Sequence, residues 1–171
     1  MRVWRKTLLL CMCLTGTATA ARADLFELID ARLEWMRDVA AYKHANSLPV
    51  EDVAREQTVI AKTLEQAAAA GLDPATTQAF FEAQIEAAKD IQSCWIARWM
   101  ETEAPAEYRD LKQEVRPVLL DLGGQIIAAL PDQTVATSER DGFVAAVQVD
   151  CLSDQSRDRM FDALTQVTRL Q

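Results

Sequence analysis

The sequence predicts an all-α protein, with about six helices in a single-domain bundle. Apolar residues recur every three to four positions through most of the chain, which is the period of a helix buried along one side. Only five glycines and five prolines interrupt the 171 residues, so long helices are favoured. Half of the residues are apolar, and a chain of this length can bury a sizeable core.

Residues 1–23 have the pattern of a secretory signal peptide. A basic start is followed by an apolar run over residues 8–14 and then by Ala21-Arg22-Ala23, which fits a signal-peptidase site. The apolar run is too short to span a membrane. We therefore predict cleavage after Ala23, with a competing site after Ala20, and a periplasmic or secreted mature protein.

Removal of this leader would change the charge of the chain. It takes away four of 18 basic residues and none of 26 acidic residues, so the net charge falls from −8 to −12. A protein this acidic is a poor ligand for nucleic acid and for anionic membranes. We expect a soluble protein that binds neither once the leader is removed.

The first half of the mature chain predicts three helices. The first covers about 24–46 and ends before a Leu-Pro pair, because proline cannot continue a helix. The second covers about 50–70, with Gly71 as its C-terminal cap. The third covers about 74–100 and begins with Asp73-Pro74, an N-cap followed by proline at the first helical position.

The second half predicts one long and two shorter helices. The long helix covers about 107–130, and Pro117 should start or kink it. Gly123-Gly124 lies inside the same pattern, where a close crossing of two helices would explain it. The shorter helices are expected at 141–149 and 154–170.

Two of the four cysteines, Cys11 and Cys13, would leave with the leader. Cys94 and Cys151 would remain. Two cysteines in an exported protein favour a disulfide, although two separate buried thiols are the alternative.

Most groups that carry covalent or metal chemistry are absent from the sequence. The one histidine, His44, has no HExxH motif, no triad partner and no metal-ligand spacing around it. There is no glycine-rich phosphate loop, and the remaining cysteines do not form a CxxC motif. We therefore expect no metal and no cofactor.

Charged residues at unusual positions are the main functional signal. Arg32 and Lys43 are eleven residues apart, about three helical turns, so both should point to nearly the same side. Between them on that side lie Met36, Val39 and Ala40, which are apolar or small. Inward-facing charges usually face a partner, and a small polyanion is the simplest candidate.

The next helix repeats this feature with Asp52, Arg55 and Glu56. Taken singly, each of these charges is more often a surface residue. Together, Arg32, Lys43, Asp52-x-x-Arg55-Glu56 and Gln92 resemble the motif of the all-helical chorismate mutases.

The resemblance extends beyond this motif. The leader and the blocks VAAYK and LPVEDVARE are similar to the secreted, periplasmic subclass of that family. The likeness is strong over residues 24–99 and looser from 104 onward. It implies one domain at 24–171, in which 24–103 carry the catalytic helices and 104–171 complete the pocket.

This family isomerises chorismate to prephenate by a Claisen rearrangement, on the route to phenylalanine and tyrosine, without metal or cofactor. The resemblance implies that Arg32 binds one substrate carboxylate and that Lys43 reaches a carboxylate and the ether oxygen. Gln92 would donate its amide N–H to that oxygen. Glu56 would accept from the ring hydroxyl, with the backbone near Asp52 sharing that role.

Further binding residues are implied by the same likeness. Arg55 would add positive potential to the pocket. Another arginine is expected from the second half, for which Arg116 is our choice and Arg109 and Lys112 are rivals. Ala88 also lines the expected site, but it departs from the family pattern, which often has a hydroxyl residue there.

Lys89, beside Ala88, could compensate for the lost hydroxyl or could face solvent. The alternative function is a non-catalytic helical periplasmic ligand-binding or scaffold protein that keeps the fold. The oligomeric state stays open between a monomer and a homodimer.

Overall fold

The computed structural model describes residues 17–171, and the first 16 residues of the predicted leader lie outside this range. Within residues 17–171 the elements are all helical, which confirms the all-α class. No helix in this range is both long and apolar enough to cross a bilayer. The elements are α1 (Thr17–Glu34), α2 (Met36–Ala45), α3 (Val53–Ala69), α4 (Pro74–Glu101), η1 (Leu111–Val115), α5 (Arg116–Ala129), η2 (Leu130–Asp132), η3 (Thr137–Glu139), α6 (Arg140–Ala146) and α7 (Asp154–Leu164).

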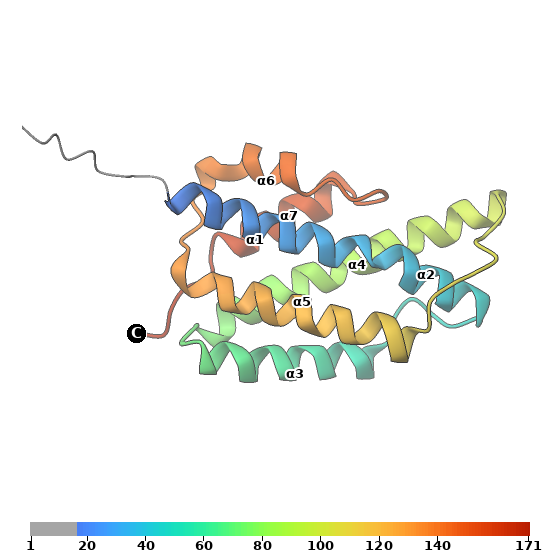
Figure 1. The fold of residues 1–171 in the computed structure, drawn as a ribbon, viewed down its shortest axis with the longest axis horizontal. Helices are drawn as coiled ribbons and strands as arrows, with labels where there is room; N and C mark the ends of the chain where they lie inside the picture. The colour runs from blue at the N-terminus through green and yellow to red at the C-terminus, as the bar shows by residue number, and fades with distance from the viewer. Residues whose placement is uncertain (1–16) are drawn as a thin grey trace, which may run out of the picture.

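The helices α1 and α2 replace the single helix predicted for 24–46. The break is local, at Trp35, and the Val39 N–H still donates to the Trp35 carbonyl at 3.1 Å. The two helices therefore lie end to end as one rod across the bundle (Figure 1). This continuity keeps residues on both sides of the break facing the same neighbours.

The turn between α3 and α4 forms as its sequence predicts. Gly71 has φ of +71°, a left-handed conformation that glycine adopts without a steric penalty. The Leu72 N–H donates to the Ala67 carbonyl at 2.9 Å, which closes the end of α3. Asp73 then caps α4 by accepting from the Thr76 N–H at 2.9 Å.

The segment predicted as one helix over 107–130 begins later and in two parts. The helical structure begins with η1, a π-helix, rather than at residue 107. Asp110 marks this start, because its carboxylate accepts from the N–H groups of Lys112 and Gln113 and so caps η1. Pro117 lies in the first turn of α5, directly after the π-helix, where the Arg116 N–H donates to the Leu111 carbonyl five residues earlier. The π-helix and α5 thus deliver Arg116 at the start of a helix.

The last two helices are shorter than predicted. The helix α6 ends at Ala146, because the next residues turn back and the Gln148 N–H donates to Asp30 on α1 at 2.8 Å. The helix α7 ends at Leu164 rather than at 170. The tail is extended instead, since the Asp73 N–H donates to the Thr168 carbonyl at 2.8 Å and ties it to the start of α4.

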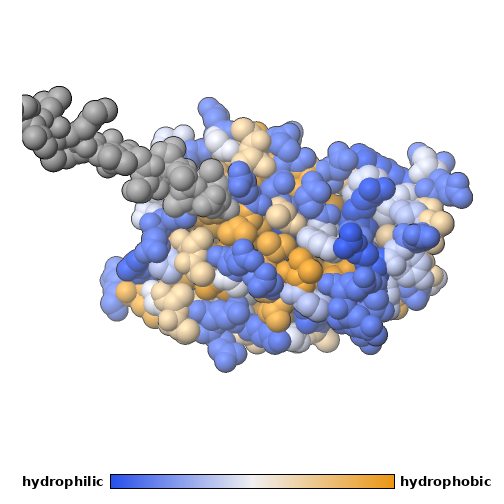
Figure 2. All heavy atoms as spheres, viewed as in Figure 1, coloured by the Kyte–Doolittle hydropathy of each residue, from blue (hydrophilic) through white to orange (hydrophobic). Residues whose placement is uncertain are grey.

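The long helix α4 runs through the middle of the bundle, with α2, α3 and α7 packed against it. Helix α5 packs on α1 and α3, and α6 lies over α1 (Figure 1). Figure 2 shows hydrophobic atoms in the middle of this face, between hydrophilic margins. The largest fully buried side chains come from α1, α4, α5, α6 and α7 and include Leu25, Ile29, Phe80, Phe81, Ile126, Phe143, Met160 and Phe161.

The glycine pair of α5 does not mark an unusually close crossing. A methyl group added at Gly123 would lie 3.9 Å from Phe81, and one added at Gly124 would lie 3.6 Å from the side-chain nitrogen of Gln66. Both are ordinary van der Waals distances. The close crossing proposed from the sequence is therefore not needed for the packing of α5.

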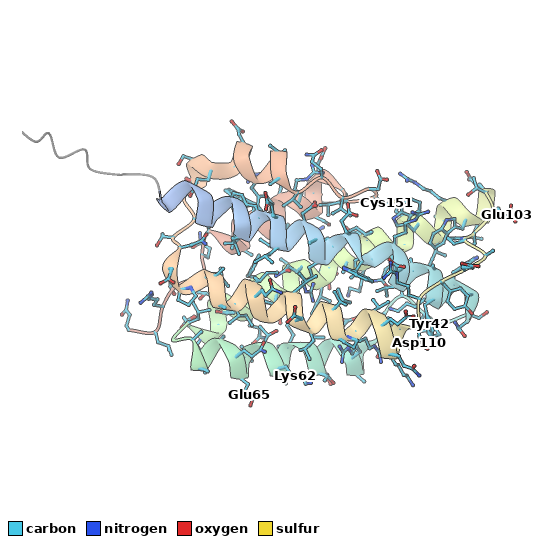
Figure 3. The ribbon with its side chains drawn as sticks, viewed as in Figure 1. Tyr42, Lys62, Glu65, Glu103, Asp110 and Cys151 are labelled. Carbon is cyan, nitrogen blue, oxygen red and sulfur yellow. A yellow bond between two sulfur atoms is a disulfide. The ribbon has the colours of Figure 1, made fainter. Side chains whose placement is uncertain are left out.

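Cys94 and Cys151 form a disulfide, which confirms the bridge favoured by the sequence. Cys94 lies on α4, and Cys151 lies in the loop between α6 and α7 (Figure 3). One turn earlier on α4, Asp90 accepts a hydrogen bond from the Ser156 hydroxyl of α7. The two links attach the C-terminal part of the chain to α4 close to Gln92.

Candidate active site

Residues of the α1–α2 rod, α3, α4 and the first half of α5 line one cleft. Its walls are apolar along Met36, Val39, Phe81, Ile85 and Leu119. Sequence reasoning missed most of these wall residues, because an apolar side chain on a helix is by default a core residue. All eight candidate site residues line the cleft: Arg32, Lys43, Asp52, Arg55, Glu56, Ala88, Gln92 and Arg116.

Arg32 lies in the last turn of α1 and is only 7% exposed. Its Nε atom is buried without a hydrogen-bond partner among the described residues. Burial, and to a lesser degree the charge of Arg55, lowers the pKa of Arg32 well below its ordinary value, to about 10. A guanidinium in these surroundings gains strongly from an anion placed beside it, because its desolvation is otherwise uncompensated.

Lys43 lies in the last turn of α2 and is also 7% exposed. Its ammonium group donates to the backbone carbonyl of Val50, in the loop before α3. Burial lowers the pKa of Lys43, the carboxylates of Asp52 and Glu56 oppose this shift, and Arg116 adds to it. The ammonium keeps further N–H donors that can serve a ligand.

The start of α3 holds three of the predicted residues together. Asp52 is the N-cap, and its Oδ1 accepts from the Arg55 N–H at 3.1 Å. The Asp52 N–H donates to Oε1 of Glu56 at 3.2 Å. This reciprocal pattern resembles a capping box and fixes the first turn of α3 against the cleft. Burial is the main cause of a lowered pKa at Arg55, and Arg116 contributes.

Gln92 is 4% exposed on α4 and faces the α1–α2 rod. Its Nε2 donates to the Ala88 carbonyl at 2.9 Å and lies 3.7 Å from the sulfur of Met36. The second contact is weak, because a thioether is a poor acceptor. An oxygen atom of a ligand would be a better acceptor for that N–H.

Arg116 is brought to the cleft by the first turn of α5. Its Nη2 lies 3.5 Å from Oδ2 of Asp52, and 27% of its side chain is exposed. The two rivals lie elsewhere: Arg109 pairs with Asp38 at 3.4 Å and covers the ring of Trp35, and Lys112 does not line the cleft. Among the described residues, Arg116 is the arginine of the second half that reaches the cleft.

Lys89 also lines the cleft, and its side chain is 21% exposed. Its ammonium group lies 2.7 Å from Glu86, 3.6 Å from Glu56 and 3.9 Å from Glu51. These pairs raise the pKa of Lys89, with the hydrogen bond to Glu86 as the largest cause. The ammonium is therefore held by carboxylates, rather than being free to replace the missing hydroxyl at Ala88.

The electrostatic balance of the cleft opposes that of the whole protein. Within residues 17–171, six basic side chains and two carboxylates line it. Lys62, on α3, is an exposed member of this set (Figure 3). A cleft with this excess of positive charge and apolar walls suits a small, compact anion with more than one negative group.

Comparisons with known proteins agree with this geometry. Residues 21–93 match the family model of chorismate mutase type II. A monofunctional chorismate mutase of Enterobacter agglomerans is 29% identical over 90% of this chain and 87% of its own length. A secreted chorismate mutase of Yersinia pestis is 29% identical over 82% of this chain and 78% of its own.

The likeness also holds in three dimensions and beyond the region of the family model. The crystal structure of the secreted chorismate mutase from Yersinia pestis superposes with a TM-score of 0.80 at 28% identity, over 85% of this chain and 97% of that chain. The match to the family model, the shared fold and the charged lining of the cleft all indicate the same likeness. In sequence and in fold, the chain is therefore similar to the all-helical, type II chorismate mutases.

Proposed function

We propose that this cleft binds chorismate and isomerises it to prephenate by a Claisen rearrangement. Chorismate carries two carboxylates on a small, largely apolar ring system. The observation that carries the proposal is the convergence of Arg32, Lys43 and Arg116, from three different helices, on the cleft that also holds the amide of Gln92.

The reaction is a pericyclic shift within one substrate, so it requires no nucleophile. It requires the enolpyruvyl arm to be held over the ring, which is a matter of positioning. It also benefits from hydrogen-bond donors where negative charge develops on the breaking ether oxygen. A rigid cleft with buried cations supplies both.

The carboxylates are best matched by the guanidinium groups. Arg32 would bind one of them, since its buried Nε lacks a partner in the described part of the chain. Arg116 would bind a carboxylate from the opposite wall. Arg55, whose charge interacts with Arg116, would add positive potential. Planar guanidinium groups suit this task because they bind carboxylates through paired hydrogen bonds.

The ether oxygen is best matched by Lys43 and Gln92. Both are buried, so their hydrogen bonds would be strengthened by the low dielectric of the site. Glu56 would accept a hydrogen bond from the ring hydroxyl. Ala88 would contact the substrate without the hydrogen bond that a hydroxyl residue could supply.

The finer assignments form part of the same proposal. Residues 24–103 would supply the catalytic helices and residues 104–171 would complete the pocket, chiefly through Arg116. The protein would be exported after cleavage of residues 1–23, since the Yersinia pestis relative is described as secreted. Its product would serve the route to phenylalanine and tyrosine.

The test is the loss of chorismate absorbance with purified protein covering residues 24–171, without added metal. We expect saturable turnover that yields prephenate, unchanged by a chelator. A matched Lys43→Ala sample shows that the activity belongs to this cleft. Absence of turnover, together with binding of a dicarboxylate analogue, would instead support the non-catalytic ligand-binding alternative.

A further inference from the structure

We propose that Lys89 is a positioning residue, which holds the carboxylate of Glu56 in the orientation that receives the ring hydroxyl of the substrate. This inference rests on the proposed mutase function. It concerns a residue that carries no role in the motif from which the site was predicted.

The contacts of Lys89 distinguish Glu56 from its other partners. The ammonium group pairs with Glu86 at 2.7 Å, with Glu56 at 3.6 Å and with Glu51 at 3.9 Å. Of these three carboxylates, only that of Glu56 belongs to a residue lining the cleft. Glu86 holds the lysine from the outside, one turn earlier on α4, and so directs its ammonium group toward α3.

The two oxygens of Glu56 are held from opposite directions. Oε1 accepts the backbone N–H of Asp52 at 3.2 Å, and Oε2 faces the ammonium group of Lys89 at 3.6 Å. The first contact belongs to the start of α3, and the second reaches across to α4. The carboxylate is therefore tied to two helices, and loss of Lys89 would leave it attached on one side only.

Charge gives a second reason for the pair. Glu56 lies near Glu51 and Asp52, and the proposed substrate is a dianion. Without a neighbouring cation, this carboxylate would repel both its neighbours and the substrate. Lys89 adds to the charge of Lys43 in offsetting that repulsion, and it leaves Glu56 a hydrogen-bond acceptor, since the ammonium can only donate.

A double-mutant cycle tests this role. We expect Lys89→Met to lower kcat/KM about 10- to 100-fold, the scale of a small misplacement of a binding group. Lys89→Arg, which keeps the charge, should recover most of this loss. In a Glu56→Gln background, adding Lys89→Met should lower kcat/KM by less than about twofold. The carboxylate that Lys89 positions is already altered in that background.

The controls separate positioning from a general structural effect. Lys112→Met removes an exposed lysine outside the cleft and should behave as wild type. Urea midpoints of the Lys89 variants should stay close to that of wild type, since Lys89 is a partly exposed ion-pair partner. If Glu56→Gln does not fold, Glu56→Ala supplies the second background.

Two results would overturn the inference while the proposed function stands. One is a Lys89→Met enzyme within twofold of wild type. The other is an equal loss from Lys89→Met in both backgrounds, which would show that Lys89 acts independently of Glu56. A wild-type protein without mutase activity would overturn the proposed function and the inference with it.

Discussion

Arg116, at the start of α5, meets Asp52, at the start of α3, with 3.5 Å between Nη2 and Oδ2. This pair joins the two halves of the chain across the mouth of the cleft. Asp52 is also the N-cap of α3, so its carboxylate is fixed by the Arg55 N–H. The arginine from the second half is thus held beside the residues of the first half without being neutralised by a tight ion pair.

The choice of Arg116 over its rivals can be tested directly. Arg116→Ala should lower kcat/KM by roughly 10²–10³, the scale of one lost charged donor at a reacting anion. Arg109→Ala should leave it nearly unchanged, because that side chain pairs with Asp38 away from the cleft. Steady-state kinetics on both variants is the measurement, and the reverse order of effects would reassign the pocket arginine.

Lys43 should be essential in its charged form. Lys43→Ala should lower kcat/KM by roughly 10²–10³, as for one transition-state donor. Because burial lowers the pKa of Lys43, activity should fall on the alkaline side at a pH below 10.5, the ordinary value for lysine. The anionic substrate favours the ammonium form, so the fall in kcat should come at a higher pH than the fall in kcat/KM. A Lys43→Ala enzyme within twofold of wild type would remove Lys43 from the mechanism.

Gln92 offers a test of the neutral donor. Its amide does not titrate, so wild type should show a broad pH optimum near neutrality. Gln92→Glu should be active only where the new carboxyl group is protonated, because only the acid form can donate a hydrogen bond. The measurement is a pH–rate profile of both proteins. Equal activity of Gln92→Glu and wild type at pH 8 would argue against the contact with the ether oxygen.

Arg32 should lower the stability of the free protein, although it is expected to bind a substrate carboxylate. Its folded pKa of about 10 lies below the ordinary value that it has in the unfolded chain, so the unfolded chain binds the proton more tightly. The resulting cost to stability is fully present below pH 10 and disappears as the pH rises above the folded pKa toward the ordinary pKa of arginine. At neutral pH, Arg32→Met should therefore raise the free energy of unfolding by about 1–4 kcal/mol, as when apolar groups replace buried charges.

The same variant should lose mutase activity and binding of a dicarboxylate analogue. Urea unfolding and calorimetric titration measure the two effects. An Arg32→Met protein less stable than wild type would show that the guanidinium is compensated in the free protein.

The disulfide should affect stability more than chemistry. Cys94 and Cys151 close a loop with a sequence separation of 57 residues, and its loss should cost about 4 kcal/mol in the chain-entropy model. The Cys94→Ala/Cys151→Ala variant should therefore unfold at lower urea, yet keep kcat near the wild-type value where it remains folded. A large loss of kcat in the folded variant would instead indicate that the bridge helps to position Gln92.

The sequence by itself determined the helical class, most helix starts and the candidate residues. Periodicity predicts helices because burial depends on which side of a helix a residue occupies. Local caps are also readable: the Asp73 side chain caps α4, and Gly71 adopts the left-handed conformation that a residue without a Cβ tolerates. The spacing of Arg32 and Lys43 predicted a shared side, and this holds even though the helix between them breaks at Trp35.

Only the tertiary structure decided which charges meet. No local pattern separates Arg116 from Arg109 or Lys112, because the outcome depends on where the π-helix ends and on how α5 packs against α3. The predicted ends of the last two helices were wrong for the same reason. The hydrogen bonds that join Gln148 to Asp30 and Asp73 to Thr168 link distant parts of the chain, and they outweigh local helix propensity. The ion pair between Lys89 and Glu56 likewise forms only because α4 and α3 face each other. The sequence sets the distance between these two helices indirectly, through the packing of the whole core.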